Sequence, residues 1–280
     1  MPSATVNGVA INYQVLGSDG PWILLTQGGR QDLELFLPLA ENFVEAGYRV
    51  IVHDRRNSGG SDVSNDAYAS EDEIFADDMQ ALCDQLGALP VIACGGAGGT
   101  RHSILMTLRH PGSTRALLLW WPSGSRPAAE NLAETYYGQY ITVAREGGMA
   151  AVAETPYYAE RIRRVPANRE RLLSWQTHDF LDTMTAWRDW FLSGADMPVI
   201  GVPEETVRGI TLPVCIMPGG DMIHPRQVAE DLARILPNAE FYDLPPQERP
   251  EDEAARLKAR LEHQRRLSDT FVAFLKKHGM

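Results

Sequence analysis

The sequence predicts an α/β protein in which a mainly parallel, doubly wound sheet carries an inserted helical lid. Short apolar runs alternate with segments of helical periodicity along most of the chain, which is typical of strand–helix–strand units. One long central stretch has helix formers and aromatic residues but no convincing buried strand. With 280 residues, the chain is long enough for one large α/β domain that contains such an insertion.

The N-terminal part begins with a hairpin and continues as alternating strands and helices. Asn7-Gly8, between two short apolar runs, is typical of a tight hairpin turn. Gly47 ends one helical segment, and acidic residues begin the next, where the helix dipole favours them. Helices are expected at residues 36–47, 71–87 and 99–110, and strands within 5–16 and at 22–26, 48–52, 91–94 and 116–121.

The central stretch predicts the lid. We expect a core made of residues 1–122 and 210–280 and a helical lid of residues 123–209, which is rich in tyrosine and tryptophan. After the lid, the core is expected to resume with a strand at 214–217, a helix at 225–236, a strand at 240–244 and a charged helix at 251–277.

Composition restricts the class of function. A formal charge of −11 argues against non-specific nucleic-acid binding, which rewards a basic surface. No apolar run approaches the ~20 residues that span a membrane, and no secretory signal is visible, so a cytoplasmic protein is expected. Cys83, Cys94 and Cys215 are scattered, which favours reduced thiols over disulfides or a metal site. The sequence does not indicate an oligomeric state.

Three short signatures occur in a fixed order. Thr26-Gln27-Gly28-Gly29-Arg30 follows an expected strand, and residues 54–62 form a polar turn, Asp-Arg-Arg-Asn-Ser-Gly-Gly-Ser-Asp. Cys94-Gly95-Gly96-Ala97-Gly98-Gly99 lies where a strand leads into a helix. A glycine-rich turn of this kind also suits phosphate binding, but the chain lacks the Lys-Ser/Thr of a P-loop and the third glycine of a dinucleotide fingerprint. Together the signatures resemble those of the α/β-hydrolase superfamily.

The resemblance implies a nucleophile elbow with the pattern G-x-S-x-G, in which Ala97 takes the place of serine. It also implies an oxyanion hole formed by the backbone N–H groups of Gly29 and Gly98. A methyl group cannot attack a carbonyl, so this chain is not expected to perform ordinary serine-hydrolase chemistry. Either alanine replaces a natural serine, which the intact elbow glycines favour, or the protein is a natural member without a nucleophile.

The remaining catalytic groups are less regular. Gly219-Gly220-Asp221 fits the family's acid, so Asp221 is expected to orient the base, unless it only caps the following helix. The family's Gly-His after the last strand is missing from residues 243–249. His224 is the candidate base. The alternative is that His224 only precedes the helix that begins at Pro225 and has no catalytic role. His102 is the second choice and is expected to point away from the site. His263 and His278, on the charged helix, are expected to be solvated.

Substrate contacts are expected from two groups of side chains. Arg30 and Arg101 suit a carboxylate or enolate, with surface ion pairing as the alternative. The pocket candidates, which core packing would also explain, are Gln27, Trp120, Trp121, Tyr137 and Tyr140.

Three functions remain open. The first is a cofactor-independent hydrolase, with no metal, that cleaves a small ester, lactone, amide or carbon–carbon bond through a serine at position 97. The second is a non-hydrolytic lyase or cyclase on the same scaffold, and the third is a non-catalytic ligand-binding protein.

Overall fold

The computed structural model describes residues 2–245 and 250–280, and its core is an eight-stranded sheet in the order β1-β2-β4-β3-β5-β6-β7-β8. The pairs β1–β2 and β2–β4 are antiparallel, and all other neighbouring pairs are parallel. The strands are β1 (Ser3–Val6), β2 (Val9–Leu16), β3 (Trp22–Thr26), β4 (Arg49–His53), β5 (Val91–Gly96), β6 (Thr114–Trp120), β7 (Val214–Met217) and β8 (Ala239–Phe241). The predicted mainly parallel, doubly wound sheet is confirmed.

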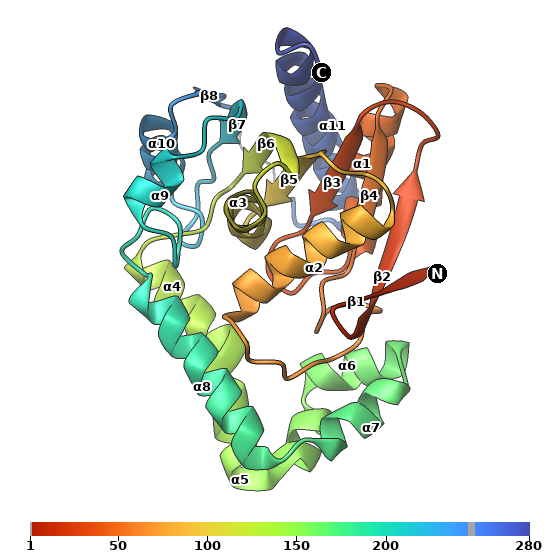
Figure 1. The fold of residues 1–280 in the computed structure, drawn as a ribbon, viewed down its shortest axis with the longest axis vertical. Helices are drawn as coiled ribbons and strands as arrows, with labels where there is room; N and C mark the ends of the chain where they lie inside the picture. Colours follow the sequence, from red (N-terminus) through yellow and green to blue (C-terminus); the bar gives the residue numbers. More distant parts are fainter. Residues whose placement is uncertain (1, 246–249) are drawn as a thin grey trace.

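Helices cover both faces of this sheet. One face packs against α2 (Glu71–Gln85), α3 (Gly98–Arg109) and α10 (Arg226–Ile235). The other packs against α1 (Leu37–Glu45), which follows the 3₁₀ turn η1 (Leu33–Phe36), and against α11 (Glu253–Lys277). In Figure 1, α2 and α3 lie in front of the sheet and α11 lies behind it.

The central strands are apolar on both sides because helices bury both sides. In β3, Leu24 packs toward α2 and α3, whereas its neighbours Ile23 and Leu25 pack toward α1 and α11. The carboxyl ends of β3, β5, β6 and β7 meet at one edge of the sheet, where sites of α/β proteins form.

The chain between β6 and β7 is helical. Its elements are α4 (Arg126–Ala133), the π-helical turn η2 (Glu134–Gly138), α5 (Gln139–Glu154), α6 (Pro156–Arg164), α7 (Ala167–Ser174), α8 (Thr177–Ser193) and α9 (Glu204–Arg208). The helices from α4 to α8 share an apolar cluster that includes Phe180, Phe191 and Tyr158 and extends to Ile74 of α2. Figure 1 shows them as a layer below the core, while α9 lies beside α10.

The last strand is shorter than predicted. A strand was expected over 240–244, but β8 ends at Phe241, and only the Tyr242 N–H still bonds to the carbonyl of Ile216 before the chain leaves the sheet. Among the described residues, no helix is both long enough and apolar enough to cross a membrane.

Candidate active site

Ala97 sits on a strained turn between β5 and α3. Its backbone angles are φ 50° and ψ −119°, a region that non-glycine residues rarely adopt. The turn is tightly packed: a Cβ atom on Gly95 would lie 2.2 Å from the carbonyl oxygen of Gly99, and one on Gly28 would lie 2.4 Å from the Cβ of Ala97. Glycine is therefore required at both positions for the elbow to close.

Two backbone N–H groups lie together beside this turn. The nitrogen of Gly29 is only 3.4 Å from the point that a Cβ atom on Gly98 would occupy, so the loop after β3 crosses the start of α3. Among the described residues, no group accepts a hydrogen bond from the N–H of Gly29 or of Gly98. Two unpaired donors at a helix N-terminus can hold a negatively charged oxygen.

A cavity of about 320 Å³ adjoins the elbow. Ala97 and Gly28 form part of its wall, together with the side chains of Trp120 and Trp121. Asp221 and His224, the predicted acid and base, line the same cavity. The remaining lining residues, which the sequence analysis did not assign to a site, are Gln31, Leu35, Phe36, Leu39, Gly96, Arg260, His263, Gln264 and Leu267.

Asp221 and His224 form a pair on the loop after β7. The Asp221 Oδ1 atom lies 2.9 Å from the His224 Nδ1 atom and accepts hydrogen bonds from the backbone N–H groups of Ile223 and His224, also at 2.9 Å. Partial burial opposes the charge of Asp221, but these hydrogen bonds and the histidine keep its pKa below the usual value. Asp221 does not cap α10, whose N-cap is Pro225. Nδ1 is therefore the ring nitrogen of His224 that contacts Asp221.

His263 was expected to be solvated, and this prediction is wrong. The residue is only 6% exposed, because it lies four residues before Leu267 on the stripe of α11 that faces the sheet. Its ring lies 5.2 Å from the ring of Trp121, whose other neighbour is the ring of His224 at 6.2 Å. Its Nε2 atom has no hydrogen-bond partner in the described structure. Burial, aided by the charge of Arg266, lowers the pKa of His263 to about 4.

Comparison with known proteins identifies the fold. A profile of the alpha/beta hydrolase fold matches residues 21–140, and solved structures of that fold cover almost the whole chain. An enol-lactonase from Burkholderia xenovorans LB400 has a TM-score of 0.64 at 21% identity, covering 98% of this chain and 100% of that one. The chain has the alpha/beta-hydrolase fold.

Other matches share less of their sequence with the chain or cover a shorter part of it. The uncharacterized hydrolase YraK of Bacillus subtilis is 32% identical over 113 residues, which are 40% of this chain and 41% of YraK. The chain thus spans about two fifths of the curated relatives that it matches. A mutant of a meta-cleavage product hydrolase from Pseudomonas fluorescens IP01, complexed with acetates, has a TM-score of 0.64 at 16% identity and covers 99% of this chain and 98% of that chain.

A second, much smaller cavity lies on the lid side of Gly29 and Gly98. Asp72 anchors its charged wall, because it accepts hydrogen bonds from Nε of Arg101 at 2.8 Å and from Nε2 of His102 at 2.6 Å. Arg55 donates to Nδ1 of His102 at 3.2 Å, so both nitrogens of that histidine are occupied. Burial and the charge of Arg55 lower the pKa of His102 to about 3. His102 lines this small cavity and not the one beside Ala97.

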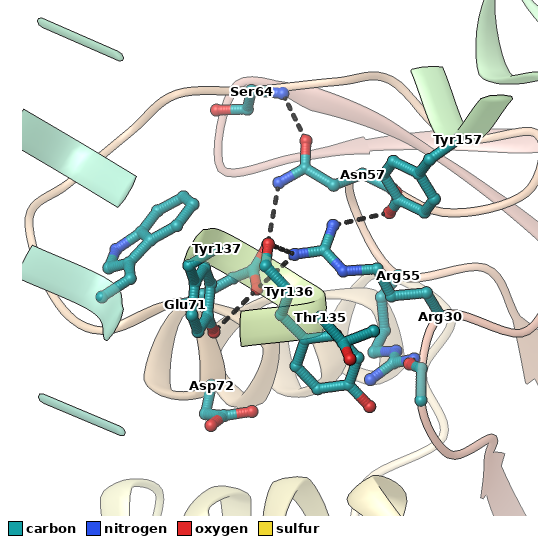
Figure 2. A network of polar contacts seen from close by, with 12 residues as sticks. Arg30, Arg55, Asn57, Ser64, Glu71, Asp72, Thr135, Tyr136, Tyr137 and Tyr157 are labelled. Atoms are coloured by element: carbon teal, nitrogen blue, oxygen red, sulfur yellow. Dashed lines mark hydrogen bonds and ion pairs between the residues drawn. The ribbon is translucent and has the colours of Figure 1, made fainter. Parts of the chain in front are cut away.

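Arg30 connects the loop after β3 to the lid (Figure 2). Its guanidinium donates to the hydroxyl of Tyr157 at 2.8 Å and to the backbone carbonyl of Tyr136 at 2.9 Å, and pairs with Glu71 at 3.4 Å. Four tyrosine rings surround it at 4.7–6.0 Å from their centroids, those of Tyr136, Tyr137, Tyr140 and Tyr157. Arg30 therefore binds the lid, and the alternative prediction, that it forms an ion pair on the surface, is wrong.

The other predicted contact residues divide into two groups. Trp120 and Trp121 line the cavity beside Ala97, and Tyr137 lines the small one. Gln27 instead donates to the backbone carbonyl of His53 at 2.7 Å, and Tyr140 lines neither cavity. Among the described residues, no group of three or more His, Cys, Asp or Glu side chains could hold a metal ion. Residues 246–249, part of the segment that lacks the family's histidine, lie outside the described residues.

Proposed function

We propose that this chain has the site of a cofactor-independent hydrolase for a small ester, lactone, amide or carbon–carbon bond, and that Ala97 removes its nucleophile. The observation that carries the proposal is the shared cavity: the strained elbow at Ala97 and the Asp221–His224 pair line one space of about 320 Å³. An enol-lactonase and a meta-cleavage product hydrolase among the structural relatives support this range of substrates.

The mechanism would run through a serine at position 97. Nε2 of His224 would take the hydroxyl proton as the serine oxygen attacks the carbonyl carbon, while Asp221 holds Nδ1 and stabilises the charged ring. The N–H groups of Gly29 and Gly98 would bind the resulting oxyanion. Its collapse would expel the leaving group with the proton from His224 and leave an acyl-enzyme. Water, deprotonated by the same histidine, would then release the acid and restore the serine.

Ala97→Ser tests the proposal directly. We expect the variant to hydrolyse p-nitrophenyl acetate and to show the added acyl mass in a rapid quench, whereas the parent chain does neither. His224→Gln in the Ala97→Ser background should remove at least a hundredfold of the gained rate. His178→Gln, which changes an exposed lid histidine, is the matched control. A folded Ala97→Ser protein with neither turnover nor adduct would contradict the proposal.

A second candidate is favoured by His263. His263 lines the cavity beside Ala97, and its buried Nε2 atom has no hydrogen-bond partner among the described residues. Such a group suits proton transfer in a lyase or cyclase, which needs no nucleophile at position 97. The parent chain would then exchange deuterium into small ketones, and His263→Gln would abolish the exchange. Ligand binding without exchange or turnover in any variant would instead indicate a binding protein.

We also propose a reducing, cytoplasmic location for the chain. Cys83, Cys94 and Cys215 are all buried and unpaired, which supports a compartment in which thiols stay reduced.

A further inference from the structure

The small cavity beside Gly29 and Gly98 is lined by several charged side chains. It encloses about 10 Å³, which is room for one oxygen-sized atom. Arg30, Arg55 and Arg101 contribute three positive charges to its lining, and Glu71 and Asp72 contribute two negative charges. The two carboxylates neutralise two of the three arginines, so the lining has one excess positive charge.

Arg55 is the cation without a partner. Glu71 pairs with Arg30, and Asp72 pairs with Arg101 and His102. No carboxylate among the described residues lies within ion-pair distance of Arg55, although the residue is only 3% exposed. Its guanidinium contacts the carbonyl of Gly29 and Nδ1 of His102, and its Nε–H has no acceptor. Burying an uncompensated charge is costly, so such a group is expected where an anion binds.

Gly98 lies next to nitrogen atoms of the loop after β3 and of Arg101 in this space. The position that a Cβ atom would take on Gly98 lies 3.4 Å from the backbone nitrogen of Gly29 and 3.8 Å from Nη2 of Arg101. The N-terminus of α3 adds its partial positive charge at the same place. Because Gly98 has no side chain, a ligand atom can approach its backbone closely on this side.

The two cavities are lined by neighbouring residues at the crossing of the loop and the elbow. Gly28 and Ala97 line the larger one, and the next residues along each segment, Gly29 and Gly98, line the smaller one. A ligand with its reacting carbonyl beside Ala97 is therefore within a few bonds of the cationic space.

We propose that the ligand is a small molecule that carries a free carboxylate in addition to its reacting bond. One oxygen of this carboxylate binds between Gly98, Arg55 and Arg101. This inference rests on the proposed function for the location of the reacting bond, but the anion site itself does not require a nucleophile. Neutral esters lack the group that compensates Arg55, so the site favours substrates that are anionic before any reaction starts.

Acetate and acetamide, of nearly equal shape, test the charge requirement on the parent Ala97 chain. We expect saturation transfer in NMR from the protein to the methyl group of acetate, and at least tenfold less to that of acetamide at the same concentration. Arg55→Gln should remove the acetate signal, while Arg109→Gln, an arginine on the outer side of α3, should leave it unchanged.

Gly98→Ala provides a second variant in case Arg55→Gln fails to fold. Its Cβ atom would meet no atom closer than 3.4 Å, so the fold should tolerate it, while the methyl group takes up space in a cavity of only about 10 Å³. Equal signals from acetate and acetamide, or acetate binding that survives Gly98→Ala, would overturn the inference. Hydrolysis by Ala97→Ser without selective acetate binding would refute the anion site alone, and selective binding without hydrolysis would refute only the hydrolase.

Discussion

The backbone of Ala97 carries strain whether or not a nucleophile is present. A non-glycine residue at φ 50° and ψ −119° costs on the order of 1–3 kcal/mol, and the surrounding glycines hold it there by close packing. A serine would adopt the same angles, because it differs from alanine by one oxygen atom. The chain thus retains the conformation of the elbow without its reacting atom.

Ala97→Gly should therefore stabilise the protein. Glycine adopts these angles without steric cost, which should raise the free energy of unfolding by about 1 kcal/mol despite the added chain entropy. Urea denaturation measures the change. Ala186→Gly, at an exposed position within α8, is the control and should lower the same quantity by about 1 kcal/mol. A loss of stability in Ala97→Gly would show that the turn is not strained.

Buried histidines make the fold sensitive to acid. Burial, as the main cause, lowers the pKa of His53 and His102 to about 3 and that of His263 to about 4. The unfolded chain binds these protons near pH 6.5, so stability should fall as the pH drops from about 6.5 toward 4, by up to about 1.4 kcal/mol per pH unit for each histidine. His263→Gln should show a shallower fall of the melting temperature in this range, and His178→Gln the same fall as the parent.

At the scale of elements, α7 joins the lid to the core through one buried amide. Asn168 accepts a hydrogen bond from the Val63 N–H at 3.0 Å and donates to the Ser61 carbonyl at 3.2 Å, both in the loop before α2. Trp187 of α8 adds a bond from Nε1 to the carbonyl of Ala69 at 3.0 Å. These contacts fix the lid against the loop that begins with Asp54.

Asn168→Ala should weaken the contact between the lid and the loop before α2. The Val63 N–H would lose its acceptor inside the protein, which costs about 1–3 kcal/mol of unfolding free energy. Limited proteolysis should then cut within the lid sooner than in the parent chain. Asn238→Ala removes an exposed asparagine that bonds one carbonyl, that of Thr211, and should change neither quantity appreciably. Unchanged stability in Asn168→Ala would mean that water replaces the lost amide.

The elements differ in how far the sequence predicts them. The glycine-rich pattern of residues 94–99 predicted the tight turn at Ala97 between β5 and α3, because crowding at a turn leaves a local signature. His263 was missed, although its spacing from Leu267 and Phe271 could have placed it on the buried stripe of α11. The unpaired charge of Arg55 could not be predicted, because it depends on which carboxylates α2 brings near it in three dimensions.

At the scale of the whole molecule, α11 supports both the core and the site. Phe271 is fully buried, and its ring lies 6.3 Å from that of Phe43 on α1 and 6.0 Å from that of Trp120. Two turns earlier, His263 on the same helix lines the cavity beside Ala97. The packing of one helix thus determines where a candidate base lies.

Phe271→Ala should weaken the molecule as a whole. Removing a fully buried ring costs about 3–5 kcal/mol of unfolding free energy, and the melting temperature should fall accordingly. Leu261→Ala on the same helix, at a position that is 40% exposed, should have a small effect. A similar loss in both variants would show that α11 contributes through helix formation alone.

Arg30 also couples the position of the lid to that of the Gly29 N–H group. It follows Gly29 directly in the chain, and its guanidinium bonds to Tyr136 and Tyr157 of the lid. A movement of the lid would either break these bonds or displace the neighbouring N–H donor. Ligand exchange and an assembled oxyanion hole would then alternate, so that the lid would have to close again before the next ligand is held at the site.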